Sequence, residues 1–305
     1  MKIVSFTPAA DPHPHDPRLG LLLDGDHVLD LTHEAARIPQ PKAYLDWFDL
    51  DGGPMHEVQI LGNAVANDAA RLEGLIAAGA VTPKSDVRLL APVPRPGKLI
   101  CIGLNYKDHA EESGMDIPER PLAFSKFASC VVGPEDEVVL PPGATEVDYE
   151  AELAFVVGRR AHRVSADKAL DHVLGYACLN DVSARDFQFA DGQWQRGKSC
   201  DTFAPLGPFI ATTDEIPAPE TLRISLRLNG ETLQDSNTDQ LIFGIAALVS
   251  ELSHFTTLEP GDVVCTGTPP GVGFARKPPV YLKGGDTMEV DIAGLGVLKN
   301  PVVVR

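Results

Sequence analysis

The strongest strand signal in this chain lies in the segment Val147-Asp148-Tyr149-Glu150-Ala151-Glu152-Leu153-Ala154-Phe155-Val156-Val157. Apolar and β-branched residues dominate the segment, and this composition predicts a β-strand. Alternate side chains of a strand point to the same face, so we expect Glu150 and Glu152 to lie side by side. Two adjacent carboxylates repel each other, and a divalent cation with oxygen ligands, such as Mg²⁺, Mn²⁺ or Ca²⁺, would relieve that repulsion. The alternative is an edge strand with a solvated polar face, and this segment alone leaves it open.

Composition and charge limit the classes of partner that the chain can have. Its 305 residues are 44% hydrophobic and 23% charged, which is typical of a globular protein with a large core. The net charge of −17 argues against nucleic acid and against anionic membrane surfaces, because both attract basic proteins. We therefore expect a small-molecule partner, no nucleic acid and no membrane.

The cysteines and the N-terminal residues bear on the compartment. Five cysteines occur without any Cys-x-x-Cys pair, which predicts free thiols in a reducing environment. Residues 1–8 are too short and too soon interrupted by proline to suggest a signal peptide. No apolar run approaches the length of a transmembrane helix. The expected location is the cytoplasm.

Two parts of unequal size are expected, with a boundary after residue 95. Residues 1–95 predict a small N-terminal α+β domain, in which Asp24-Gly25-Asp26 is typical of a hairpin turn. Apolar residues at helical spacing predict one helix over residues 56–79. Three prolines in Leu90–Gly97 preclude regular structure and mark the boundary. The expected hairpin strands are Leu19–Leu23 and His27–Leu31.

Residues 96–305 predict a mostly β domain, because short apolar segments alternate there with Pro and Gly. The fold class is therefore mainly β with some α. One longer helix is expected from about Leu241 to Leu252. The expected strands are Leu99–Ile102, Val138–Leu140, Glu152–Val157, Leu174–Leu179, Phe209–Ala211, Arg223–Leu228, Val263–Thr266 and Met288–Ile292.

A histidine and a glutamate follow the first of these strands. If the polar stretch after Gly103 is helical, His109 and Glu112 lie three residues apart on one face and can touch. A carboxylate beside an imidazole orients it and raises its basicity, which suits activation of a water molecule. An incidental pair on a surface helix is the alternative.

A second polar stretch follows the strand that ends near Leu179. Asp181 could supply a third carboxylate to the same cation, or it could simply form a turn. Arg185 and Gln188 lie three residues apart, as on one helical turn. The arginine could bind a substrate carboxylate through two hydrogen bonds, or it could pair with Asp186.

Two Gly/Pro-bounded loops carry further candidates. Lys198 lies between small residues in one of them, an unusual place for a merely solvated lysine. In the other, Thr268 and neighbouring backbone N–H groups could bind a carboxylate or an oxyanion. This loop lacks the lysine of a P-loop, so a nucleotide site is not expected. His13-Pro14-His15 lies far from the carboxylate strand, and we do not expect it to bind metal.

Together these motifs resemble the fumarylacetoacetate hydrolase family over about residues 97–305. The resemblance implies a β-sandwich roll, a bound Mg²⁺ or Mn²⁺ for which Ca²⁺ could substitute, and a homodimer. Ile102 occupies a position where some family hydrolases carry a fourth carboxylate, so the acylpyruvase-like branch is the closer match. The motifs are Gly103-Leu104-Asn105-Tyr106 with His109, Glu150-Ala151-Glu152, Asp181-Val182-Ser183-Ala184-Arg185-Asp186, Gly197-Lys198-Ser199 and Thr266-Gly267-Thr268-Pro269.

The resemblance also implies a role for each candidate residue. The cation would be held by Glu150, Glu152 and Asp181. Catalysis would fall to His109 and Glu112, which activate water, and to Lys198, which supports the leaving enolate. Substrate contacts would come from Tyr106, Lys126, Arg185, Gln188 and Thr268.

The implied reaction is hydrolysis of a C–C bond in a 1,3-diketo acid of the acylpyruvate or fumarylpyruvate type, which releases pyruvate and a carboxylic acid. An oxaloacetate decarboxylase or a 2-hydroxy-diene-dioate isomerase would use the same enolate chemistry. A metal-stabilised binding module is the non-enzymatic alternative. The segments Glu111–Pro121 and Phe189–Gln195, with Trp194, are expected to close over the pocket and select the acyl group.

Overall fold

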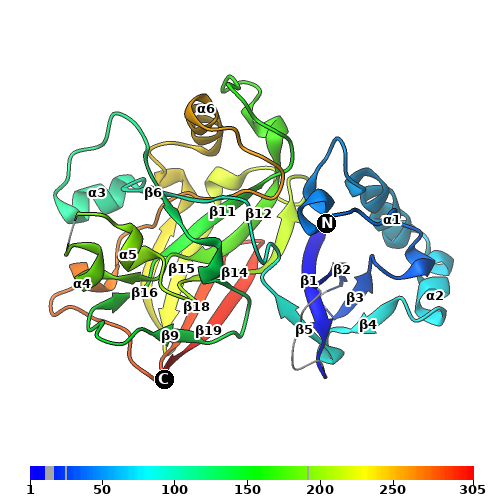
Figure 1. The fold of residues 1–305 in the computed structure, drawn as a ribbon, viewed down its shortest axis with the longest axis horizontal. Helices are drawn as coiled ribbons and strands as arrows, with labels where there is room; N and C mark the ends of the chain where they lie inside the picture. Colours follow the sequence, from blue (N-terminus) through cyan, green and yellow to red (C-terminus); the bar gives the residue numbers. More distant parts are fainter. Residues whose placement is uncertain (11–16, 25, 191) are drawn as a thin grey trace.

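The computed structural model describes residues 1–10, 17–24, 26–190 and 192–305. Strands dominate it and short helices lie around them (Figure 1), as expected for a mainly β protein. The α-helices are α1 (Met55–Asn67), α2 (Ala69–Ala77), α3 (Lys107–Ser113), α4 (Arg185–Gln188), α5 (Gln195–Lys198) and α6 (Ile245–Phe255). The strands are β1 (Lys2–Pro8), β2 (Arg18–Leu23), β3 (His27–Asp30), β4 (Val81–Pro83), β5 (Val87–Leu90), β6 (Leu99–Gly103), β7 (Leu122–Lys126), β8 (Val131–Val132), β9 (Val138–Leu140), β10 (Val147–Asp148), β11 (Ala151–Val157), β12 (Val173–Asn180), β13 (Ser183–Ala184), β14 (Ala204–Thr212), β15 (Arg223–Leu228), β16 (Glu231–Asn237), β17 (Val263–Cys265), β18 (Thr287–Ile292) and β19 (Gly296–Val304).

The central feature is a twelve-stranded sheet in which β11 lies well inside the strand order β4-β3-β2-β1-β14-β12-β11-β17-β6-β7. Strand β11 pairs antiparallel with β12 on one side and with β17 on the other. All of its residues, Ala151–Val157, are buried. The solvated-edge alternative for this segment is therefore wrong, and its carboxylates lie in the protein interior.

A second sheet completes a sandwich. Its five strands have the order β16-β15-β18-β19-β9, and it packs against β11, β12 and β14 of the large sheet. Alternation along β18 produces this packing, since Met288, Val290 and Ile292 are buried while the residues between them are only partly buried. The predicted β-sandwich architecture is thus confirmed.

The N-terminal strands extend the same large sheet. Strands β2 and β3 form the predicted antiparallel hairpin, although Gly25 at its turn lies outside the described residues. Strand β1 pairs with β14, with Ile3 opposite Ile210, so the sheet runs without a break across the predicted boundary. Residues 91–98 contain no helix or strand, as their prolines predict. The division into two domains stays a prediction.

Two helix predictions differ from the structure. The single helix expected over 56–79 is two helices, because Asp68 is extended and its side chain caps α2 by accepting the N–H of Arg71. The helix expected from Leu241 begins instead at Ile245, whose N–H donates to the Glu220 carboxylate. The residues before it are held in non-helical conformation, and Phe243 exchanges hydrogen bonds with the Asn105 side chain.

All five cysteines fall within the described residues, and all are free, as predicted. Among those same residues, no helix combines the length and the apolar character needed to cross a membrane. The motif His13-Pro14-His15 lies outside the described residues.

Candidate active site

Three carboxylates converge where β11 and β12 lie side by side. The antiparallel register puts Ala151 opposite Asn180, so Glu150 and Asp181 come directly beyond a paired position. The N–H of Asp181 donates to the Glu150 carbonyl oxygen at 2.9 Å and fixes this juxtaposition. One side-chain oxygen from each of Glu150, Glu152 and Asp181 lies within 4.8 Å of the others. The strand pairing thus gathers the three residues predicted as metal ligands.

Buried cations surround two of these carboxylates. Lys198, on α5, places Nζ 2.8 Å from Glu150 Oε2 and 2.8 Å from Asp181 Oδ2. Lys126 Nζ donates to the other Asp181 oxygen, and Arg185 Nη2 lies 2.6 Å from Glu150 Oε1. Burial alone would raise the pKa of Glu150, but Lys198 and Arg185 outweigh it and lower the pKa to about 2. Glu150 is therefore fully ionised and compensated.

Glu152 has no such partner among the described residues. Its carboxylate accepts one hydrogen bond, from the Gly267 N–H at 2.9 Å. Burial, together with the negative charges of Asp181 and Glu150, raises its pKa well above the ordinary value. In this cluster four buried carboxylates face three buried cations, which leaves one uncompensated negative charge. The carboxylates are Asp148, Glu150, Glu152 and Asp181, and the cations are Lys126, Arg185 and Lys198.

This donor set fits a divalent cation. Hard divalent ions prefer carboxylate oxygens, and the excess negative charge is centred on Glu152, beside the two other candidate ligands. Glu150, Glu152 and Asp181 would hold the ion. The side chain of Asp181 bonds to lysines rather than to its own turn, so the turn-forming alternative does not account for it.

The predicted histidine–glutamate pair lies on α3. His109 Nδ1 is 3.2 Å from Glu112 Oε2, which leaves the other ring nitrogen free of this contact. Both Glu112 oxygens also accept the Gly271 N–H, at 3.1 and 3.2 Å. His109 is only 9% exposed, and both residues line the same cavity as Glu150 and Glu152. The pair is therefore part of a cavity wall, not an incidental pair on an outer surface.

The cavity has a volume of about 930 Å³, and its lining includes both buried and exposed residues. The buried part of its lining is polar and consists mainly of Glu150, Glu152, Arg185, Gln188 and Lys198. Aromatic side chains belong to the same lining: half-buried Phe124 packs edge-on against Trp194, and exposed Phe189 packs against Phe274. Both segments predicted to close over the pocket contribute to its wall, although residue 191 lies outside the described residues. Figure 1 shows the surrounding helices α3, α4 and α5 at the end of the molecule remote from α1 and α2.

Arg185 and Thr268 line the cavity but are also bound within the framework. Arg185 pairs with Asp148 and Glu150, while Asp186 accepts the N–H of Thr145. The alternative of an Arg185–Asp186 pair is therefore wrong. The Thr268 hydroxyl donates to the Ala151 carbonyl oxygen at 2.9 Å.

Tyr106 and Lys126 do not lie on the cavity wall. The Tyr106 side chain is fully buried, and the residue bridges to Leu241 through its backbone. Lys126 lies behind the cluster, where its Nζ donates to Asp181 and to the Val182 carbonyl oxygen. Substrate contact by either residue remains a prediction.

Asp148 is a site residue that the sequence analysis did not single out. It is fully buried, and its carboxylate accepts the Nε–H of Arg185 at 2.9 Å and the N–H of Gly273 at 2.7 Å. It also accepts the N–H of Phe274, whose ring lies against the Arg185 guanidinium. One carboxylate therefore fixes both the arginine beside Glu150 and the loop that binds Glu112. The only signal in the sequence was a further carboxylate in the strand segment that carries Glu150 and Glu152.

Asp148→Asn is expected to destabilise the protein by about 2–3 kcal/mol, because an amide nitrogen cannot accept the hydrogen bonds of Arg185 and Phe274. Catalytic rate should fall as well, since the loop that orients Glu112 loses its anchor. Urea unfolding and steady-state kinetics would measure both effects. Asp235→Asn, which breaks an exposed pair with Arg223, is the matched control and should change neither. Wild-type stability in Asp148→Asn would contradict this role.

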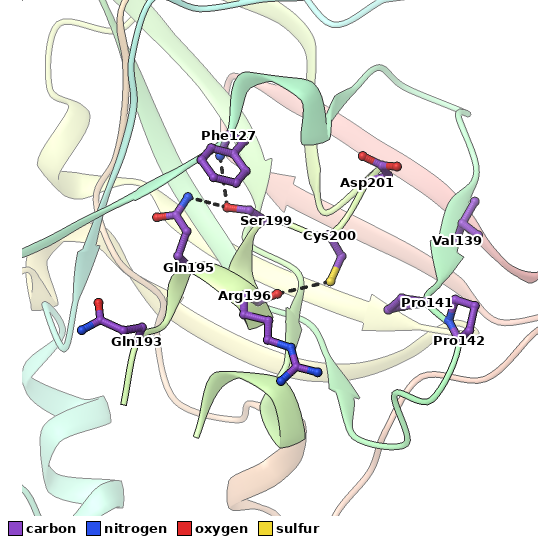
Figure 2. A pocket seen from close by; sticks show the side chains of 10 residues that line it. All are labelled: Phe127, Val139, Pro141, Pro142, Gln193, Gln195, Arg196, Ser199, Cys200 and Asp201. Atoms are coloured by element: carbon purple, nitrogen blue, oxygen red, sulfur yellow. Dashed lines mark hydrogen bonds between the residues drawn. The ribbon is translucent and has the colours of Figure 1, made fainter. Parts of the chain in front are cut away.

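A second, smaller pocket of about 680 Å³ includes Gln195 and Arg196 of α5 in its lining (Figure 2). Ser199 Oγ accepts the N–H of Phe127 and an amide hydrogen of Gln195 there, and Cys200 Sγ contacts the Arg196 carbonyl oxygen. None of the predicted site residues is among the described residues that line it. The helix thus turns Lys198 toward the carboxylates and its other side chains toward this separate pocket.

Comparison with known proteins agrees with this geometry. Residues 98–303 match the model of the fumarylacetoacetate (FAA) hydrolase C-terminal family. The Bos taurus protein named oxaloacetate tautomerase FAHD2A, mitochondrial, is 43% identical over 99% of this chain and 92% of its own length. The structure of fumarylacetoacetate hydrolase from Exiguobacterium antarcticum is 34% identical over all of both chains, with a TM-score of 0.80. A 2-hydroxyhepta-2,4-diene-1,7-dioate isomerase from Mycobacterium marinum is 32% identical over 100% of this chain and 99% of its own, with a TM-score of 0.75.

These relatives are named as enzymes, and this chain is an enzyme too, which excludes the non-enzymatic binding module. The relatives catalyse different reactions by name, so the match establishes the class of substrate, small keto acids, and not the reaction. The family model covers two thirds of the chain and includes every predicted site residue. The chain therefore belongs to the fumarylacetoacetate hydrolase family.

Proposed function

We propose that this enzyme interconverts the keto and enol forms of a 2-oxo dicarboxylic acid, with oxaloacetate as the simplest substrate. The observation that carries the proposal is the position of protonated Lys198, a buried residue of the cavity lining whose Nζ lies 2.8 Å from both Glu150 and Asp181. The name of the bovine relative, at 43% identity, supports the choice of oxaloacetate. Mg²⁺ or Mn²⁺, held by Glu150, Glu152 and Asp181, would supply positive charge that stabilises an enolate oxygen.

The residues on the cavity wall divide the proton chemistry between them. Nearby Asp181 and Glu150 outweigh the effect of burial and raise the pKa of Lys198, so its ammonium serves as a donor and not as a base. His109, oriented by Glu112, is the base that takes the proton from C3 of the substrate. Lys198 donates a hydrogen bond to the C2 oxygen as charge develops there. The proton that His109 takes from C3 is then returned to the C2 oxygen, so His109 is regenerated as the base and the reaction needs no co-reactant.

Hydrolysis of an acylpyruvate is the second candidate, and two observations favour it. His109 and Glu112 suit activation of a water molecule as well as removal of a carbon-bound proton. The cavity also extends beyond the carboxylates into an aromatic region that a four-carbon acid would leave empty. Decarboxylation and double-bond isomerisation begin from the same enolate and are outcomes of the same assays. A homodimer and a cytoplasmic location stay predictions, and the bovine relative is by name mitochondrial.

The proposal is tested with oxaloacetate, acetylpyruvate and fumarylpyruvate, each with Mg²⁺ and with EDTA. Enol absorbance measures tautomerisation, and coupled detection of pyruvate measures cleavage. Metal-dependent decay of the oxaloacetate enol above the uncatalysed rate would support the tautomerase. Pyruvate release from an acylpyruvate without that acceleration would replace it with the hydrolase, and pyruvate from oxaloacetate alone would indicate a decarboxylase.

His109→Ala is expected to slow tautomerisation and any acylpyruvate hydrolysis by about 10²–10⁴-fold, because both reactions use the same base. Binding of Mn²⁺, measured by calorimetry, should stay within a factor of about two, since His109 is not a proposed ligand. His56→Ala, on the exposed face of α1, is the matched control. Full tautomerase activity in His109→Ala would mean that another group removes the C3 proton.

A further inference from the structure

A buried glutamine on β16 reaches across the sandwich to the strand that carries the candidate metal ligands. Gln234 is only 1% exposed, and its side chain bonds through both the oxygen and the nitrogen. Oε1 accepts the N–H of Ala151 at 2.9 Å, while Nε2 donates to Thr268 Oγ1 and to the Pro269 carbonyl oxygen, each at 2.8 Å. Because the Ala151 N–H can only donate and the Pro269 carbonyl oxygen can only accept, these bonds fix the orientation of the amide.

These bonds complete the backbone of Ala151, the residue between the two glutamates of the site. Strand β17, which pairs with β11, ends at Cys265 before it reaches Ala151. Two side chains take the place of that strand, because Gln234 accepts the Ala151 N–H and the Thr268 hydroxyl donates to the Ala151 carbonyl oxygen at 2.9 Å. Since Gln234 also donates to Thr268, the three residues form a closed ring of hydrogen bonds. A buried peptide group without a partner is costly, so the ring holds this segment in place.

Gln234 links the two sheets of the sandwich at this point. Strand β16 belongs to the five-stranded sheet, where Gln234 pairs with Leu226, whereas Ala151 begins β11 of the large sheet. Among the described residues that line the cavity none comes from β16, so Gln234 can act on the site only through the groups that it holds. Ser236 shares the same face of the strand but donates to Asp108 on α3, and this bond does not involve the carboxylate strand.

We infer that Gln234 is a positioning residue of the metal site, which holds Glu150 and Glu152 in place for a divalent cation. It acts through the peptide of Ala151, because a rotation of that peptide would move both neighbouring carboxylates relative to Asp181. Residues that orient metal ligands without touching the metal set the affinity of the site. The inference rests on the proposed function, since that function assigns the cation to these carboxylates.

The test measures Mn²⁺ binding by calorimetry in the absence of substrate. Gln234→Met keeps the length of the side chain but loses its hydrogen bonds, and it should raise the Kd for Mn²⁺ about tenfold or more. In the enol assay, the Mn²⁺ concentration that gives half-maximal rate should rise by the same factor. Thr268→Val breaks the ring at another bond and should also raise the Kd, so it replaces Gln234→Met if that variant does not fold. Ser236→Ala, on the same face of β16, should leave the Kd within a factor of about two.

Asn300→Leu is the matched control for the loss of a buried amide. Asn300 is likewise 1% exposed, and its Nδ2 donates to the Gly133 and Asp136 carbonyl oxygens. This variant should lower the Tm of the metal-free protein, as Gln234→Met does, without changing the Kd for Mn²⁺. An unchanged Kd in a folded variant of the ring, or an equal rise in Asn300→Leu, would overturn the inference, because Gln234 would then be only a structural contact between the sheets. Weaker Mn²⁺ binding by Gln234→Met in a protein that tautomerises no oxaloacetate would refute the proposed function and retain this inference.

Discussion

Replacing Glu152 with glutamine is expected to raise the stability of the metal-free enzyme and to abolish its response to Mg²⁺. The carboxylate is 2% exposed, lies beside Glu150 and Asp181, and has only the Gly267 N–H as a partner among the described residues. Removal of an uncompensated buried charge should raise the free energy of unfolding by about 1–3 kcal/mol. Loss of one of three candidate ligands should abolish metal-dependent turnover. Denaturant unfolding with Mg²⁺ and with EDTA measures the first effect, and the enol assay measures the second.

Glu150→Gln provides the contrast. The same chemical change should lower the free energy of unfolding of the metal-free protein, whereas Glu152→Gln should raise it. Glu150 is held by Lys198 and Arg185, and its removal leaves both cations short of a partner. The free energy of unfolding of the metal-free protein should therefore fall by about 3–5 kcal/mol. Glu231→Gln, at an exposed position of β16, controls for the substitution itself. If both buried variants lost stability equally, Glu152 would have a compensating partner and the argument for a cation would fail.

Lys198→Met is expected to have the largest combined effect on stability and rate. Methionine keeps the volume of the side chain but removes the ammonium that lies 2.8 Å from both Glu150 and Asp181. Breaking this buried network should lower the free energy of unfolding by about 3–5 kcal/mol without metal. Turnover should fall by about 10²–10³-fold, because the donor to the developing oxyanion is lost.

Mg²⁺ should restore more stability to Lys198→Met than it adds to the wild-type enzyme. In the variant the cation would replace the positive charge that Lys198 supplies to Glu150 and Asp181, whereas in the wild type it shares both carboxylates with Lys198. Unfolding titrations across a range of Mg²⁺ concentrations measure this difference. Lys98→Met is the control, since Lys98 forms a separate ion pair with Asp262. An unchanged response to Mg²⁺ would show that Lys198 and the cation do not act on the same carboxylates.

Local pattern predicted most strands with apolar runs and missed others of mixed composition, including β16 and β19, which both contain buried residues. Strand β11 was recognisable because its residues are apolar and buried on both faces. Strand β16 has the sequence Glu231–Asn237, which is largely polar, and it pairs with β15 at the margin of the smaller sheet. Its conformation depends on backbone pairing with β15 and on buried Gln234, whose side chain hydrogen-bonds to Ala151, Thr268 and Pro269. The break between α1 and α2 was likewise hidden, because Asp68 interrupts an apolar spacing that continues on both sides.

The sequence by itself determined the local features of the site. Spacing along one strand placed Glu150 beside Glu152, spacing along one helical turn placed His109 beside Glu112, and the order of the motifs indicated the family. Only the tertiary structure decided which charges are compensated. Lys198 lies 48 positions from Glu150 along the chain, yet its Nζ lies 2.8 Å from that carboxylate. Spacing within an element fixes only local neighbours, whereas the energy of a buried charge depends on every charged group that folding brings near it.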